Sequence, residues 1–193
     1  LSLKNNQLNK LCQYFYNDNF LFQQFACSSS HLINWQGNNK DIKNAKNKFW
    51  QTMNTLVSNS RQMADTDYID RFAKVGSLAF QYDNFTFSSK ISDEIYRSEL
   101  NNNNINFEEY RVGYGYFSEI NNISNKELIE KITNRYQTIT YFGVDAPELA
   151  KNLIEAGVEG VDRIVPVGSA LDLDIMWDGY DIIRSLSRVI EVK

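Results

Sequence analysis

Helix and strand patterns alternate regularly in the last third of the chain. A serine–glutamate capping box opens a helix pattern over 124–136, and a β-branched and aromatic strand pattern follows at 138–142. Asp145 is a typical cap for a second helix pattern at 146–156, and 163–167 again has a strand pattern. Strands that alternate with helices at this spacing predict parallel βαβ units. The expected fold class is therefore α/β.

Three upstream segments have apolar residues at every third or fourth position, a spacing typical of helices with one buried face. The polar run 17–19 is expected to end the first helix, and Asp41 can cap the second. The expected buried positions are Leu8, Leu11, Cys12 and Phe15 in the first helix, Ile42, Ala45, Phe49, Met53, Leu56 and Val57 in the second, and Tyr68, Ile69, Phe72 and Ala73 in the third.

Alternating apolar residues predict strands elsewhere, and the asparagine run 101–104 predicts a solvated loop. No segment has the composition of a linker, so we expect one domain over 1–193. Its core should be parallel strands near 32–35, 138–142 and 163–167, with helices on both faces. The other predicted strands are 95–100, 110–116 and a stretch that contains Phe85 and Phe87.

Composition excludes several classes of function. The net charge of -4 and the lack of a Lys/Arg cluster interleaved with aromatic residues argue against a nucleic-acid partner. No run of 18 apolar residues is present, so no membrane span is expected, and without a targeting signal we expect a cytoplasmic protein. A single histidine and the absence of a C-x-x-C motif exclude the usual structural zinc sites, and no metal is expected.

Cys27 is the strongest candidate for a catalytic residue. It lies in a predicted loop between small residues, Ala26, Ser28 and Ser29, which let the backbone approach a substrate and present N–H groups to a developing oxyanion. A buried structural cysteine remains the alternative from local sequence alone. His31 need not face Cys27 if it begins a strand, so a Cys–His dyad is weakly supported.

Other polar groups fit an active site less well. The acidic pairs Glu108–Glu109 and Asp172–Asp174 are expected to be solvated edges or caps. The glycines of 111–117 have the spacing of neither a dinucleotide fingerprint nor a phosphate-binding loop. The chain therefore shows no cofactor motif of its own.

Three segments, Phe25–His31, Gly160–Asp172 and Ile175–Asp181, resemble the acyl-CoA reductase family of bacterial bioluminescence, the LuxC type. That family is itself similar to aldehyde dehydrogenases. The resemblance implies an aldehyde-dehydrogenase-like catalytic domain that carries the nucleophile. It also implies a dinucleotide-binding domain upstream of Leu1, which would bind NADPH, and a chain that is part of a longer protein.

The resemblance further implies a reaction. Cys27 would take a fatty acyl group from acyl-CoA or from an acylated carrier or synthetase protein, and NADPH would reduce the thioester to a fatty aldehyde. Trp177 and Tyr180 would line the acyl tunnel, and subunits would pair into a homo-oligomer through the C-terminal tail. Two rival functions stay open: a cysteine-dependent acyltransferase or thioesterase without hydride transfer, and a non-enzymatic assembly domain in which Cys27 is buried and inert.

Overall fold

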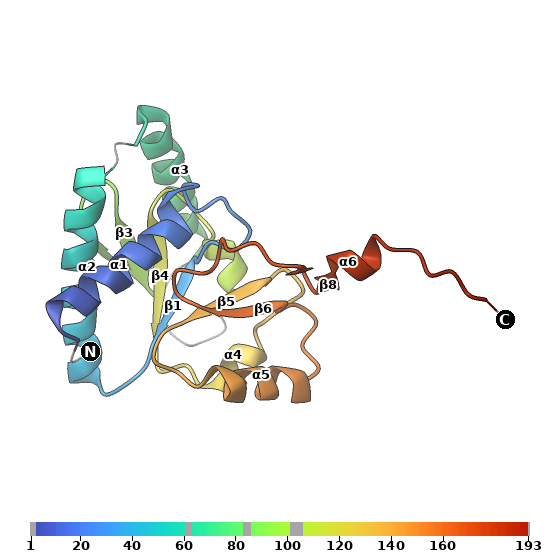
Figure 1. Ribbon diagram of the computed structural model, residues 1–193. Coiled ribbons are helices and arrows are strands. Elements are labelled where there is room, and N and C mark those ends of the chain that lie inside the picture. Colours follow the sequence, from blue (N-terminus) through green and yellow to red (C-terminus); the bar gives the residue numbers. More distant parts are fainter. Residues whose placement is uncertain (1–2, 61–62, 83–85, 101–105, 193) are drawn as a thin grey trace.

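The computed structural model describes residues 3–60, 63–82, 86–100 and 106–192, without the side chains of 86–89. Helices and strands are mixed along the chain (Figure 1). In chain order the elements are α1 (Asn5–Phe20), β1 (Leu32–Trp35), α2 (Asn39–Ser60), α3 (Asp65–Gln81), β2 (Thr86–Lys90), β3 (Tyr96–Glu99), the 3-10 helix η1 (Phe107–Tyr110), β4 (Tyr116–Asn121), α4 (Asn125–Ile129), β5 (Thr138–Tyr141), α5 (Ala146–Glu155), β6 (Arg163–Pro166), β7 (Met176–Trp177), β8 (Tyr180–Asp181) and α6 (Ile182–Ser185).

The largest sheet has four strands in the order β1-β4-β3-β2. β1, β4 and β3 run parallel, with Leu32 opposite Ser118 and Tyr96 opposite Tyr116, whereas β2 pairs antiparallel with β3 at one edge. Parallel strands expose their carboxyl ends along one edge of a sheet. The amino end of β1, which follows the Cys27 loop, therefore lies on the opposite side of the sheet from the carboxyl ends of β3 and β4.

Helices cover both faces of this sheet. Side chains alternate between the faces along a strand, so Phe117 and Tyr116 of β4 enter different cores. Phe117 packs with α1 and α2 in one core, and Tyr116 packs with α3 and η1 in the other. The expected helices on both faces are confirmed for this sheet.

A second sheet consists of β5 and β6 alone, and they pair in parallel, with Ile139 opposite Ile164. α4 and α5 lie side by side next to it (Figure 1). The strand–helix–strand unit predicted at 138–167 is thus confirmed. The prediction of one core that joins β1 to β5 and β6 is wrong, because β1 takes β4 as its ladder partner and β5 and β6 form a separate sheet. The chain just before β1 meets β5 where Ser30 Oγ lies 3.2 Å from Thr140 Oγ1.

The predicted strand at 110–116 is also wrong. Tyr110 ends η1, and Gly113, Tyr114 and Gly115 all have positive φ angles, of 83°, 53° and 75°. This conformation makes a turn and not a strand. A Cβ atom on Gly115 would lie 2.0 Å from the carbonyl oxygen of Glu94, so only glycine fits there. The strand β4 begins only at Tyr116, the last residue of the predicted strand.

The first three helices confirm most of the expected buried positions. α1 nevertheless continues through the polar run 17–19 to Phe20 and buries Asp18 and Asn19. In α2, Asn38 is the cap: its Oδ1 accepts the N–H of Asp41 at 2.9 Å, so Asp41 lies in the first turn. Leu56 of the expected α2 face is half-buried.

The inward face predicted for α3 is wrong apart from Tyr68, which is half-buried. Ile69 and Phe72 are 66% and 81% exposed, and Ala73 is exposed as well. Arg71 takes the core position because its guanidinium donates to the carbonyl oxygens of Tyr114 and Asp93. A buried guanidinium must keep its hydrogen bonds, so these two contacts determine which face of α3 points to the core. That face carries Arg71, Val75 and Leu78.

The C-terminal part of the chain is less helical than its pattern suggests. α4 has its predicted capping box but ends at Ile129, and α6 ends at Ser185, so the apolar pattern through Val189 is not a continuous helix. The tail extends away from the rest of the molecule (Figure 1). Among the described helices, none is long and apolar enough to span a membrane. The expected loop at 101–104 and Phe85 lie outside the described residues, and so does the side chain of Phe87.

Candidate functional site

Cys27 lies at the surface, in the connection between α1 and β1. The backbone N–H of Ser29 donates to the carbonyl oxygen of Ala26 at 3.0 Å and closes a turn with Cys27 and Ser28 at its centre. Cys27 is exposed, whereas Ser28 and Ser29 are buried. A turn that points a thiol outward and its neighbours inward presents the sulfur to a partner from solution.

Gln24 holds the loop against the sheet. Gln23 and Gln24 both have positive φ angles, 55° and 61°, which cost free energy in residues other than glycine and need compensation. The buried Gln24 side chain donates to the carbonyl oxygens of Ser30 and Tyr116 and accepts the N–H of Gly115 at 2.7 Å. These three hydrogen bonds tie the Cys27 loop to the start of β4.

Asp18 and Asn19 support the loop from α1. The Oδ1 of Asn19 accepts the N–H of Ser30 at 2.7 Å, and the carbonyl oxygen of Asp18 accepts the hydroxyl of Ser29 at 3.0 Å. The Asp18 carboxylate accepts the N–H groups of Gly168 and Ala170, at 2.6 and 3.1 Å. Burial raises the pKa of Asp18, although these two N–H groups oppose the shift. One residue thus joins the Cys27 loop to the loop after β6.

Several backbone N–H groups of the loop, among them those of Cys27 and Ser28, have no partner among the described residues. Both donors of Ser29 are used inside the protein, by Ala26 and Asp18. Ser29 is therefore placed to support the loop, and the N–H groups of Cys27 and Ser28 are unpartnered donors next to the thiol along the chain.

Cys12 differs from Cys27 in each of these respects. It lies on the buried face of α1 with 0% exposure, and its thiol donates to the carbonyl oxygen of Phe49 at 3.7 Å. Burial raises the pKa of Cys12 to about 12, which keeps the thiol protonated. Both cysteines are free thiols. The predicted contrast between a packed Cys12 and an accessible Cys27 is confirmed.

His31 does not form a dyad with Cys27 in the described structure. Its imidazole is mostly buried, and burial together with the charges of Arg111 and Lys74 lowers the pKa of His31 to about 4. Its Nδ1 is buried and has no hydrogen-bond partner among the described residues. The imidazole is therefore neutral at pH 7, in line with the weak support that the sequence gives to a dyad.

Exposed apolar and cationic side chains surround the loop. Leu21, Phe22 and Phe25 are each more than half exposed. The Phe25 ring meets Tyr114 edge to face at 4.8 Å, and the ammonium of Lys74 lies 5.3 Å from the centre of the Phe25 ring. An apolar surface edged by positive charge suits a molecule with a hydrocarbon chain and an anionic group.

Trp177 and Tyr180 face each other across the β7–β8 hairpin. The guanidinium carbon of Arg163 lies 4.7 Å from the centre of the Trp177 ring, and Arg163 also donates to the carbonyl oxygen of Ala170. Tyr180 is 67% exposed. Among the described residues no hydrogen bond or ring contact joins either side chain to the Cys27 loop. Trp177 is connected to that loop indirectly: it stacks on Arg163, Arg163 donates to the loop after β6, and Asp18 joins that loop to the Cys27 loop.

Other acidic groups do not complete the site. Glu108 pairs with Arg135 at 3.4 Å and accepts a hydrogen bond from the Thr133 hydroxyl. Neither partner belongs to the Cys27 loop. No group of three side chains able to hold a metal ion occurs in the described ranges. Gln24, Asp18 and Asn19 could not be identified from the sequence, because polar residues give no periodic signal that separates a buried role from a solvated one.

No model of a known protein family matches the chain, and no curated protein matches it either.

Proposed function

We propose that this chain is the nucleophile-bearing part of an NADPH-dependent fatty acyl-CoA reductase that works through an acyl-Cys27 thioester. The observation that carries the proposal is the accessible Cys27, held on a turn by buried polar residues while the second cysteine is packed away. An exposed cysteine without such a frame would support only chance reactivity. The resemblance of the segments Phe25–His31 and Gly160–Asp172 adds to this argument, and Asp18 brings these two segments together.

The first half-reaction follows from the residues around the turn. The thiolate of Cys27 attacks the carbonyl carbon of the acyl thioester, and the electron pair moves to the carbonyl oxygen, which the N–H groups of Cys27 and Ser28 can stabilise. Collapse of this intermediate expels the thiolate of the donor and leaves the acyl group on Cys27. The exposed apolar side chains of Leu21, Phe22 and Phe25 offer a surface for the hydrocarbon chain.

Among the described residues, the glycine-rich segment does not form a loop that could hold the phosphates of NADPH. The glycines of 111–117 form a turn that packs on the Cys27 loop, with Phe25 against Gly113, and they do not lead into a helix that could face a phosphate. We therefore assign the cofactor to a dinucleotide-binding domain in the same protein and derive no hydride step from the residues described.

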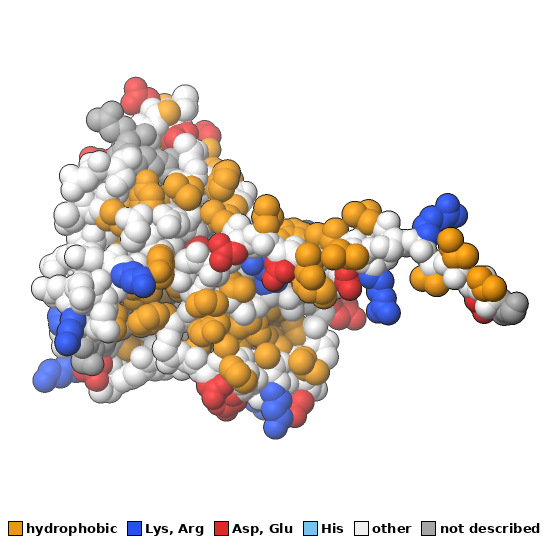
Figure 2. All heavy atoms as spheres, in the orientation of Figure 1, with side chains coloured by type: hydrophobic (Ala, Val, Ile, Leu, Met, Phe, Trp, Pro, Cys, Tyr) orange, Lys and Arg blue, Asp and Glu red, His pale blue; other side chains and the backbone are white. Residues whose placement is uncertain are grey.

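The acyl donor in this proposal is acyl-CoA or an acylated carrier or synthetase protein. Lys74 and Arg111 are exposed cations next to the loop, and their positive charge favours a donor that carries phosphate or carboxylate groups. The protein is proposed to act in the cytoplasm. The tail residues Leu186, Val189, Ile190 and Val192 are each more than four-fifths exposed, which supports a homo-oligomer that covers them (Figure 2).

Product analysis separates this function from its rivals. The protein that carries this chain together with its dinucleotide-binding domain is incubated with a long-chain acyl-CoA, with and without NADPH. A reductase gives fatty aldehyde only when NADPH is present. Free fatty acid at the same rate in both samples would instead identify a thioesterase, and no acyl turnover in either sample would favour an assembly domain.

A further inference from the structure

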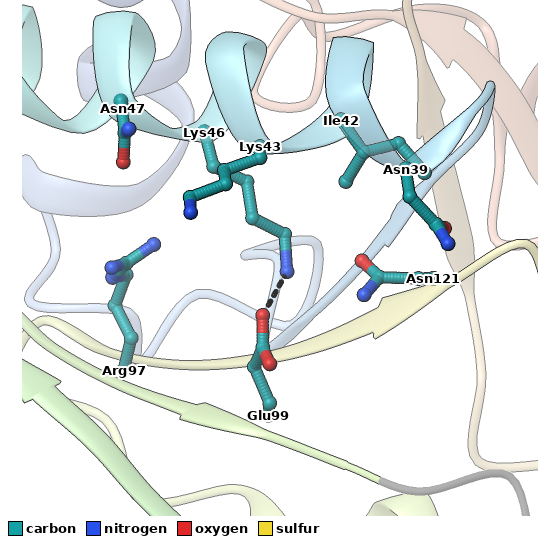
Figure 3. Close-up of a pocket in the computed structure, with 8 residues that line it drawn as sticks. All are labelled: Asn39, Ile42, Lys43, Lys46, Asn47, Arg97, Glu99 and Asn121. Atoms are coloured by element: carbon teal, nitrogen blue, oxygen red, sulfur yellow. Dashed lines mark hydrogen bonds and ion pairs between the residues drawn. The ribbon is translucent and has the colours of Figure 1, made fainter.

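A cavity of about 460 Å³ lies between the first half of α2 and the carboxyl ends of β3 and β4. Figure 3 shows Lys43 and Lys46 entering it from α2, Arg97 and Glu99 from β3, and Asn121 from the end of β4. Cys27 precedes the amino end of β1, which runs parallel to β3 and β4. The cavity and Cys27 therefore lie at opposite edges of the sheet, and the cavity has no part in the reaction proposed above.

Buried groups behind the cavity fix two of its cations. The carboxylate of Glu119 is fully buried and lies 3.1 Å from Arg97 and 3.5 Å from the Lys46 ammonium. It also accepts the indole N–H groups of Trp35 and Trp50, at 2.9 and 2.6 Å. Glu119 thus has its accepting positions filled from inside the protein, and it holds Arg97 and Lys46 at the cavity wall.

Glu99 is the replaceable group. It pairs with Lys46 at 2.5 Å, but its side chain is 51% exposed, and Lys46 keeps the carboxylate of Glu119 as a partner when Glu99 turns into solvent. Lys43 forms no ion pair among the described residues. With Glu99 turned away, three cations would line the cavity, and among the described residues Glu119 is the buried carboxylate that balances one of their charges. The excess of two positive charges matches the charge of a phosphate group at neutral pH.

We propose that this cavity binds a phosphate group, either as the free ion or on a small organic molecule. Lys43, Lys46 and Arg97 hold the phosphate oxygens, and Glu99 competes with the phosphate for Lys46. Charge-assisted hydrogen bonds from a guanidinium and two ammonium groups are the usual way to hold a phosphate in a protein. The N–H of Asp41 in the first turn of α2 is already taken by the Asn38 side chain.

Position in the fold agrees with this assignment. Ligands of open α/β sheets bind outside the carboxyl ends of the strands, where the chain can leave a crevice without breaking the ladder. Glu99 and Asn121 are the last residues of two parallel strands. The cavity is also larger than a bare phosphate requires, so it leaves room for the rest of a small phosphate ester.

The test uses the indole N–H signals of Trp35 and Trp50 in an NMR titration of the whole chain with inorganic phosphate. Both indoles donate to Glu119 next to the cavity, whereas Trp177 stacks on Arg163 and serves as an internal control. We expect saturable shifts of the first two signals and none of the third. Glycerol 3-phosphate in place of phosphate distinguishes the two sources: tighter binding of the ester identifies an organic phosphate, and equal binding identifies the phosphate ion as the ligand.

Matched variants separate a built site from general attraction to a lysine-rich helix. Lys43→Gln should weaken phosphate binding about tenfold, the loss of one charge-assisted contact. Lys48→Gln, the same change at an exposed position of α2 outside the cavity, should change it less than about twofold. Glu99→Gln should strengthen it. Equal effects of Lys43→Gln and Lys48→Gln, or no saturable shift of either indole, would overturn the proposal.

Discussion

The carboxylate of Asp18 accepts the backbone N–H of Gly168 at 2.6 Å, across 150 residues of sequence. The same residue accepts the hydroxyl of Ser29 through its carbonyl oxygen. The end of α1, the Cys27 loop and the loop after β6 thus meet at one buried residue, through its backbone carbonyl on one side and its side chain on the other. The orientation of Cys27 depends on this arrangement, and its strength can be measured.

Asp18→Asn should destabilise the protein by about 1–3 kcal/mol, because an amide nitrogen would face one of two backbone donors and leave it without an acceptor. Urea denaturation measures the change in the free energy of unfolding. Asp65→Asn, at an exposed position in the first turn of α3, is the control and should cost well under about 1 kcal/mol. Equal losses for the two variants would mean that Asp18 does not hold the loops together.

His31 should make folding depend on pH. Its pKa is about 4 in the folded protein and near 6.5 in the unfolded chain, so between these values the unfolded chain binds a proton that the folded protein does not. The stabilising contribution is present above pH 6.5 and is lost as the pH falls toward 4, on the order of 3 kcal/mol.

The His31→Gln variant isolates this contribution, because His31 is the single histidine of the chain. Urea unfolding at pH 7 and pH 4.5 should show a larger loss of stability in the native protein than in the variant. The same loss in both proteins would show that carboxylates alone account for the acid sensitivity.

The Glu119 cluster predicts a strong contrast between two neighbouring glutamates. Glu119→Gln removes the charge that Arg97 and Lys46 share in a buried site, and should cost about 3–5 kcal/mol. Glu99→Gln removes a half-exposed carboxylate and should cost under about 1 kcal/mol. Thermal or urea unfolding of both variants checks the difference, and comparable costs would contradict the burial of the cluster.

The apolar tail predicts self-association. Light scattering of the native chain at micromolar concentration should give a mass above that of a monomer. Replacing Val189 and Ile190 with aspartate should shift the mass toward the monomer, since both side chains are exposed and neither supports the core. A monomeric native chain, or an oligomer that tolerates both changes, would exclude the tail as the contact.

Periodic patterns predicted the strand–helix–strand unit of the second sheet well. The strand at Thr138–Tyr141, the helix at Ala146–Glu155 and the strand at Arg163–Pro166 follow their apolar and capping signals closely. Those signals are local: a cap, a proline in the first turn and a β-branched run each act within a few residues. The parallel pairing of the two strands follows from the connecting helix.

Long-range polar contacts determine the features that the periodic patterns did not predict, namely the buried face of α3 and the end of α1. α3 turned its Arg71 inward because distant carbonyl groups satisfy the guanidinium, and α1 continued past 17–19 because Ser30 and Gly168 satisfy Asn19 and Asp18. The position of Cys27 in a loop between an apolar run and a strand was predicted from the sequence. The frame that holds it was not, since Gln24 gains its role from Tyr116 and Gly115, 91 or more residues away.

Competitive alkylation of the two cysteines tests the central claim most directly. The chain is treated briefly with iodoacetamide, quenched and digested, and mass spectrometry follows the adducts on the Cys27 and Cys12 peptides. Cys27 should react first because it is exposed, and Cys12 should react only after unfolding, since it is fully buried with a pKa of about 12. A chain in which Cys12 is alkylated first, or in which Cys27 stays unmodified until urea is added, would contradict the assignment of Cys27 as the nucleophile.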